Sequence, residues 1–135
     1  RIMRVCLIGS PHWSNKKKIK DTILGLKERF QENLVIVSGG NAFGADPIIK
    51  KYSLEMDCNY KEFNPSHTQQ NLYSVMPATF FERDYSPKNF FVRNKIMVGY
   101  SDCIILFMPK NKRTKSEFNI IKCSKKMGKK IVIIE

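Results

Sequence analysis

Short apolar segments alternate along the chain with segments of helical periodicity, and this alternation restricts the possible folds more than any other feature of the sequence. Several apolar segments, such as CIILFM at 103–108, are apolar at successive positions, which is typical of strands covered on both faces. The segments that predict strands are 4–8, 34–37, 60–63, 103–108 and 131–134. Five such strands indicate a sheet that lies inside the molecule.

Four segments between the predicted strands indicate helices. Apolar residues recur at helical spacing in 19–30 and in 45–56. A Ser-Pro pair at 86–87 fits an N-cap followed by proline at the first helical position, and it opens a third helix that runs to about residue 98. Thr114 and Glu117 fit a capping box, which predicts a last helix to about residue 127.

The predicted order is β-α-β-α-β-loop-α-β-α-β. Alternation of this kind implies right-handed crossovers, and so parallel strands with helices on both faces of the sheet. We therefore predict an α/β fold, a Rossmann-like three-layer domain with a mostly parallel five-stranded sheet. The 135 residues suit one compact domain.

One long segment, residues 64–86, has no clear period. Unstructured loops of this length are uncommon in compact domains unless they are lids, binding loops or disordered. The segment contains Tyr73, Phe80, Phe81 and Tyr85, which favours an ordered segment. Three interpretations stay open: a lid over a site, a packed Ω-loop or additional short helix, and disorder.

The formal net charge of +12 favours anionic partners, such as nucleotides, nucleic acid or phosphorylated metabolites, but it does not choose among them. A solvated lysine-rich surface is the alternative.

The four cysteines lie far apart and have no ligand-like spacing relative to the histidines, so we expect neither a metal nor another cofactor. No apolar segment approaches the length of a membrane span, and we expect a cytoplasmic protein.

Ligands of open parallel sheets bind beyond the carboxyl ends of the strands, which directs attention to the loops after the first, second and fourth strands. The loop after the second strand is SGGNAFGAD, residues 38–46, called here the glycine loop. Its glycines Gly39, Gly40 and Gly44 leave backbone N–H groups accessible to an anion, and a helix N-terminus follows. Asp46 has two possible roles, as the N-cap of that helix or as a contact to a ligand hydroxyl or sugar.

Three other segments contain candidate ligand-binding residues. Gly9 and Ser10 follow the first strand, and Trp13 either stacks on a ligand ring or packs in the core. In the third predicted helix, Arg93 either binds a phosphate or carboxylate or forms a surface ion pair, and Asn94 falls on the apolar stripe, where it needs a hydrogen-bond partner.

The fourth loop, PKNKRTKSE, is basic and directly precedes a predicted helix N-terminus. This makes it a second plausible seat for an anion. Thr114 in this loop either donates its hydroxyl to a ligand or only caps the helix.

Taken together, GSPHW, SGGNAFGAD, RNKIMV and YSDCIILF resemble the SLOG superfamily, particularly its YspA-like branch. The similarity covers essentially the whole chain in the expected order. It implies a Rossmann-like domain that binds nucleotides or nucleotide-derived ligands, with relatives among phosphoribohydrolases, DNA-processing proteins and sensor domains. The residues that match the motifs are Gly9, Ser10, Trp13, Gly39, Gly40, Gly44, Asp46, Arg93 and Asn94, and Ser38 at the start of the glycine loop is a further candidate for ligand binding. The resemblance favours the ligand-facing role for Asp46, and relatives of this kind suggest a homo-dimer or higher oligomer.

The chain departs from the family pattern at two places. Pro11 stands where many members have Arg, and the fourth loop lacks the P-G-G-x-G-T sequence of the phosphoribohydrolases. The leading hypothesis is therefore a sensor or sequestering protein that binds a nucleotide or nucleotide-derived small ligand. The second is an N-glycosidic bond hydrolase with Asp46 or Glu117 as its catalytic carboxylate, and the third is a nucleic-acid-binding protein.

Overall fold

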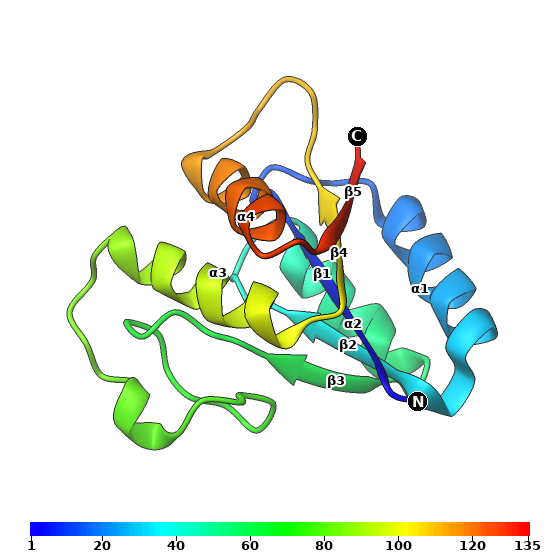
Figure 1. Cartoon of the computed structure of the whole chain (residues 1–135), viewed down its shortest axis with the longest axis horizontal. Coiled ribbons are helices and arrows are strands. Elements are labelled where there is room, and N and C mark those ends of the chain that lie inside the picture. Colours follow the sequence, from blue (N-terminus) through cyan, green and yellow to red (C-terminus); the bar gives the residue numbers. More distant parts are fainter.

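A computed structural model describes all 135 residues and contains five strands and four α-helices (Figure 1). The strands are β1 (Met3–Gly9), β2 (Leu34–Ser38), β3 (Asn59–Glu62), β4 (Cys103–Phe107) and β5 (Lys130–Ile134). The helices are α1 (Lys16–Phe30), α2 (Ala45–Glu55), α3 (Lys88–Tyr100) and α4 (Lys115–Lys126), and short 3-10 turns occupy Gln31–Asn33 and Ala78–Phe80.

The five strands form one sheet in the order β3-β2-β1-β4-β5, and every neighbouring pair is parallel. The predicted α/β class and the Rossmann-like arrangement are thus confirmed, with a sheet that is entirely parallel. The chain builds outward from β1 to β3 and then returns to the other side of β1 to form β4. Such a reversal of strand order marks the place where ligands bind in folds of this kind.

The sheet has a separate hydrophobic core on each face, because successive side chains of a strand point to opposite faces. On one face, Val5 and Leu7 of β1 pack with residues of α1 and α2 such as Ile19 and Ile49. On the other, Cys6 and Ile8 pack with residues of α3 and α4, namely Met97, Val98 and Ile120. Figure 1 shows α3 and α4 together on the near face of the sheet. The successive apolar positions noted in the sequence are explained by this double burial.

The helix ends were predicted with mixed success. The Ser86 N-cap assignment is off by one residue, because α3 begins at Lys88 and its N-cap is Pro87, although Ser86 Oγ accepts the Lys88 N–H at 3.3 Å. The predicted capping box of α4 is present, with Thr114 N–H donating to Glu117 Oε1 at 3.2 Å. The N-cap assignment of Asp46 is wrong, because α2 begins at Ala45 and its N-cap is Gly44.

The long segment between β3 and α3 is ordered and packs along the edge of the sheet. Ser74 forms a parallel bridge with Glu62, so part of the segment continues the sheet beyond β3. Arg83 N–H donates to Ser66 O at 3.2 Å, which ties the end of the segment to its beginning. Phe81 is buried. The segment thus has a fixed structure with one 3-10 turn, and its function as a lid stays a prediction.

None of the helices combines the length and the apolar character that crossing a bilayer would require.

Candidate functional site

A pocket of about 650 Å³ opens at the carboxyl ends of the strands, next to the point where the strand order reverses. Pockets of roughly 300–1,000 Å³ at this edge of a parallel sheet are typical ligand sites. Five parts of the chain line it. They are Ile8 and Gly9 at the end of β1 with Pro11 after it, residues 40–43 of the glycine loop, Asn64, Pro65, residues 67–69 and Asn71 of the long segment, Tyr85, Pro87, Phe90 and Phe91 around the start of α3, and Thr114, residues 115–117 and Ile120 at the start of α4. The loops after β1, β2 and β4 meet here, as the sequence predicts.

The glycine loop forms one wall of this pocket through its backbone. Gly44 has φ +79° and lies against the backbone of Ser10 and Pro11, a position and conformation that leave no room for a side chain. The amides of Gly40, Ala42 and Phe43 donate to no group of the chain. These residues line the pocket, so their N–H groups are available to an acceptor bound there.

The N-terminus of α4 forms a second wall. Thr114 and Glu117 both line the pocket, and their side chains are engaged with one another in the capping box. The exposed side chain of Lys115 also borders the pocket. The positive end of the helix and Lys115 favour an anionic ligand beside the glycine loop, whereas the Glu117 carboxylate, which the capping box holds, opposes it.

Asp46 lies behind the glycine loop and has no exposed surface. Its Oδ1 accepts the Gly9 N–H at 3.2 Å and its Oδ2 accepts the Asn41 N–H at 3.1 Å, so the carboxylate joins the loops after β1 and β2. Burial raises the pKa of Asp46 to about 6, although the positive charge of Arg93 and the two amides act in the opposite direction. In this structure Asp46 organises the loops and does not line the pocket.

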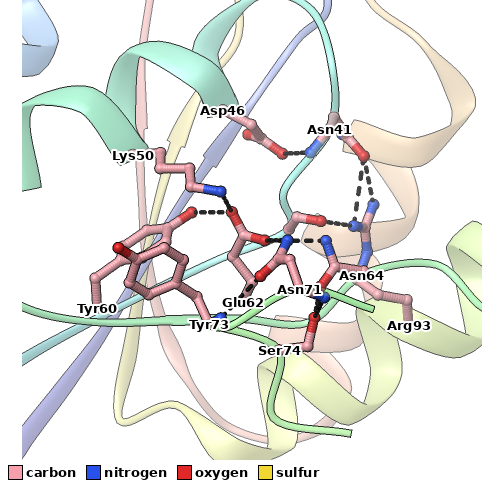
Figure 2. A network of polar contacts seen from close by, with 11 residues as sticks. Asn41, Asp46, Lys50, Tyr60, Glu62, Asn64, Asn71, Tyr73, Ser74 and Arg93 are labelled. Carbon is pink, nitrogen blue, oxygen red and sulfur yellow. Dashed lines mark hydrogen bonds and ion pairs between the residues drawn. The ribbon is translucent and has the colours of Figure 1, made fainter. Parts of the chain in front are cut away.

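Arg93 is 1% exposed, and its guanidinium group holds the glycine loop in place through hydrogen bonds. Its Nη1 donates to Gly39 O at 2.7 Å and to Phe63 O at 3.2 Å, and both terminal nitrogens lie 3.4 Å from Asn41 Oδ1 (Figure 2). No carboxylate lies within ion-pair distance of it. The alternative of a surface ion pair is therefore wrong, while a direct contact between Arg93 and a ligand stays a prediction.

Asn94 has the hydrogen-bond partners that its burial requires. Its Oδ1 accepts from Arg93 Nε at 2.9 Å, and its Nδ2 donates to Ser116 Oγ and Asn119 Oδ1, each at 3.2 Å. The adjacent pair Arg93 and Asn94 thus connects the glycine loop to the first turns of α4. The glycine loop and the start of α4 are the two walls of the pocket that carry N–H donors.

The remaining predicted residues lie beneath the surface. Trp13 is 6% exposed and packs edge-on against Phe107 with ring centroids 5.3 Å apart, so it occupies the core position that the sequence left open. Ser10 is buried, and its Oγ accepts the His12 N–H at 3.0 Å. Ser38 is buried at the end of β2. Of the predicted ligand-binding residues, Gly9, Gly40 and Thr114 line the pocket.

Sequence reasoning missed a polar network at the end of β3, centred on Glu62, which is 1% exposed. Figure 2 shows its carboxylate surrounded by Lys50, Tyr60, Asn64 and Asn71. The distances are 3.1 Å to Lys50 Nζ, 2.8 Å to the Tyr60 hydroxyl, 3.0 Å to Asn64 Nδ2 and 2.6 Å to Asn71 Nδ2. Burial acts to raise the pKa of Glu62, but the hydrogen bonds from these groups outweigh it and the pKa is lowered. The available signal was the polar end of YKEFN, which follows the third strand and not the first, second or fourth.

A cluster of three rings was missed as well. His67, Tyr85 and Phe90 line the pocket and pack edge to face, with His67 4.8 Å from Tyr85 and 5.1 Å from Phe90 between ring centroids. Two of them belong to the long segment, where no periodicity indicates which side chains meet. Their aromatic character was the available signal.

Comparison with solved structures finds the same fold in proteins of low sequence identity. The chain matches DNA processing protein A from Helicobacter pylori with a TM-score of 0.67 at 20% identity, over 98% of this chain and 65% of that one. It matches the molybdenum cofactor binding protein from Rippkaea orientalis with a TM-score of 0.72 at 15% identity, and the molybdenum cofactor carrier protein from Chlamydomonas reinhardtii with a TM-score of 0.64 at 14% identity. Both latter matches cover 98% of this chain and 76% of the other. The chain thus spans about two thirds to three quarters of the length of these structures.

No protein-family model matches the sequence, and no curated protein matches it either. The fold is therefore the property that this chain shares with the solved structures.

Proposed function

We propose that this protein binds a nucleotide or a nucleotide-derived small ligand in the pocket, as a sensor or sequestering protein. One observation supports the proposal most strongly: two groups of backbone N–H donors line the same pocket of about 650 Å³. The glycine loop contributes the free amides of Gly40, Ala42 and Phe43, and α4 contributes its N-terminus with Lys115 beside it. Phosphate groups bind well to such arrangements because the N–H groups and the helix dipole act together.

We further propose that the chain belongs to the SLOG superfamily, in its YspA-like branch. The order of the four sequence motifs supports this, and so does the likeness in fold to a DNA processing protein and to two proteins that bind or carry the molybdenum cofactor. Those proteins are described as binding single-stranded DNA or that cofactor, which supports a ligand-binding role in general.

Binding is better supported than hydrolysis of an N-glycosidic bond. A catalytic carboxylate must reach the reacting sugar or its attacking water. Asp46 has no exposed surface and both of its oxygens accept backbone amides, while Glu117 is 2% exposed and caps α4. Either residue would have to leave these partners before it could act as a catalyst.

Calorimetric titration with nucleoside monophosphates, cyclic nucleotides and ADP-ribose tests the proposal. We expect at least one of them to bind with a stoichiometry of one. Lys115→Ala should weaken that binding roughly 5- to 10-fold, because it removes a cation beside the anion. Lys125→Ala, at the other end of α4, is the matched control and should leave the affinity unchanged.

Well-folded protein that binds no member of the panel would overturn the proposal, as would equal effects of the two lysine substitutions. Chromatography of the incubated nucleotide separates binding from turnover. We expect intact nucleotide, whereas free base that disappears with Asp46→Asn would instead support the hydrolase.

A further inference from the structure

The pocket has an aromatic end, formed by three rings from separate parts of the chain. His67 comes from the start of the long segment, Tyr85 from its end, and Phe90 from the first turn of α3. Tyr85 is 69% exposed although its ring packs against His67. Phe43 of the glycine loop also lines the pocket and is 74% exposed. Large aromatic surfaces left uncovered at a pocket are typical of sites that stack a flat ring.

Hydrogen bonding fixes the protonation state of His67. The amide nitrogen of Asn89 lies 3.0 Å from Asp84 O, to which it donates, and 3.1 Å from Nδ1 of His67. An amide nitrogen only donates, so Nδ1 of His67 accepts, and the ring proton is on Nε2. Burial, together with the positive charge of Arg93, lowers the pKa of His67, which agrees with a neutral imidazole.

The two ends of the pocket therefore differ in character. The glycine loop and the α4 N-terminus offer backbone donors and a lysine, which suit an anion, whereas the aromatic end is uncharged. A second phosphate or carboxylate finds no positive charge at the aromatic end, whereas an uncharged ring gains stacking surface there.

We propose that the end of the pocket formed by His67, Tyr85 and Phe90 is a subsite for an uncharged planar heterocycle, such as a nucleobase. The subsite orients the ligand, with its ring on these side chains and its phosphate toward the glycine loop. This inference rests on the proposed function, because it assumes that the same pocket holds the anionic part of the ligand.

A comparison of two ligands isolates the contribution of the ring. Ribose 5-phosphate has the sugar and phosphate of a nucleoside monophosphate but no ring. We expect the wild-type protein to bind the best nucleoside monophosphate about 5- to 100-fold more tightly than ribose 5-phosphate, which is the usual effect of stacking one base. Tyr85→Ala should remove most of this preference without changing the affinity for ribose 5-phosphate, and Tyr85→Phe should keep the preference.

Two further variants distinguish a loss of ligand binding from a loss of folding. Leu72→Ala removes an apolar side chain that is 90% exposed in the same segment and does not line the pocket, so it should change neither affinity. His67→Ala should act like Tyr85→Ala. A cluster that only stabilises the segment would lower the thermal stability in the Tyr85→Ala variant but leave the preference for the nucleotide intact, and that result overturns the inference.

The remaining outcomes separate the two proposals. Equal affinity of the wild-type protein for nucleotide and ribose 5-phosphate overturns the aromatic subsite while leaving the anion site in place. Failure to bind either compound, or any other member of the nucleotide panel, overturns the proposed function and the subsite with it.

Discussion

At the scale of single residues, the buried carboxylate of Asp46 makes the stability of the fold depend on pH. Its pKa is raised from 3.8 to about 6 by burial. A carboxyl group with a higher pKa in the folded chain stabilises the fold most below its unfolded pKa, and this contribution is lost as the pH rises through the folded value. A rise of about two units corresponds to about 3 kcal/mol.

Asp46→Asn removes this titration. We expect the free energy of unfolding of the wild-type protein, minus that of the variant, to fall by about 3 kcal/mol between pH 3 and about pH 7. Urea denaturation across this range measures the difference. The control is Asp21→Asn, on the exposed face of α1, whose difference from wild type should vary much less. A constant difference for Asp46→Asn would contradict the buried, amide-bound carboxylate described above.

At the scale of elements, the long segment depends on Glu62 for its attachment to the sheet. Asn71 donates to the Glu62 carboxylate, and the Glu62 backbone both donates to Tyr73 O and accepts from Val75 N–H, each at 2.9 Å. Ser74 adds a bond to Asn64, itself a partner of Glu62 (Figure 2). The side chain and the backbone of Glu62 thus both link the edge strand β3 to a segment that contributes part of the pocket wall.

Glu62→Gln should loosen this attachment. Glutamine offers one acceptor oxygen in place of two and places an NH₂ group against the Lys50 ammonium or the Asn71 amide. We expect local opening of residues 71–75 to become easier by about 1–3 kcal/mol, with a corresponding 5- to 100-fold faster exchange of the Val75 amide hydrogen. Hydrogen exchange read by mass spectrometry measures this. Glu55→Gln, at the exposed end of α2, is the control, and equal exchange in both variants would contradict the role of Glu62.

The elements and the position of the site could be predicted from the sequence, because both depend on local patterns. Successive apolar residues in β1 and β4 indicated buried parallel strands, and the strand order then brought three loops to one edge. The sequence could not predict how deeply each side chain is buried or which groups it contacts. Asp46 matched both an N-cap and a ligand contact, and only the packing of α2 beneath the loop after β1 decides that it reaches Gly9. Asn94 clearly needed a partner, but that partner lies on another helix, 22 to 25 residues away.

The aromatic end of the pocket was beyond sequence reasoning for a different reason. His67 and Tyr85 are held by an irregular segment whose course depends on single contacts such as the bond from Arg83 N–H to Ser66 O. No periodicity indicates which side chains meet in such a segment.

At the scale of the whole molecule, positive charge exceeds negative charge by 12, with 24 Lys and Arg against 12 Asp and Glu. A field of this sign attracts every polyanion at low salt, whether or not a specific site exists. The nucleic-acid hypothesis therefore needs a test that separates attraction to the surface from binding in the pocket.

Salt dependence provides the test. Single-stranded DNA held by surface lysines releases counterions, so its affinity should fall by a factor of 100 or more between 50 and 200 mM salt. A mononucleotide held by backbone donors in the pocket makes few such contacts, and its affinity should fall less than about 10-fold. Fluorescence anisotropy of a labelled oligonucleotide and calorimetry of the nucleotide measure the two. If the oligonucleotide keeps its affinity at 200 mM salt and is displaced by the nucleotide, the pocket is a binding site for nucleic acid, and a dedicated small-ligand function must be abandoned.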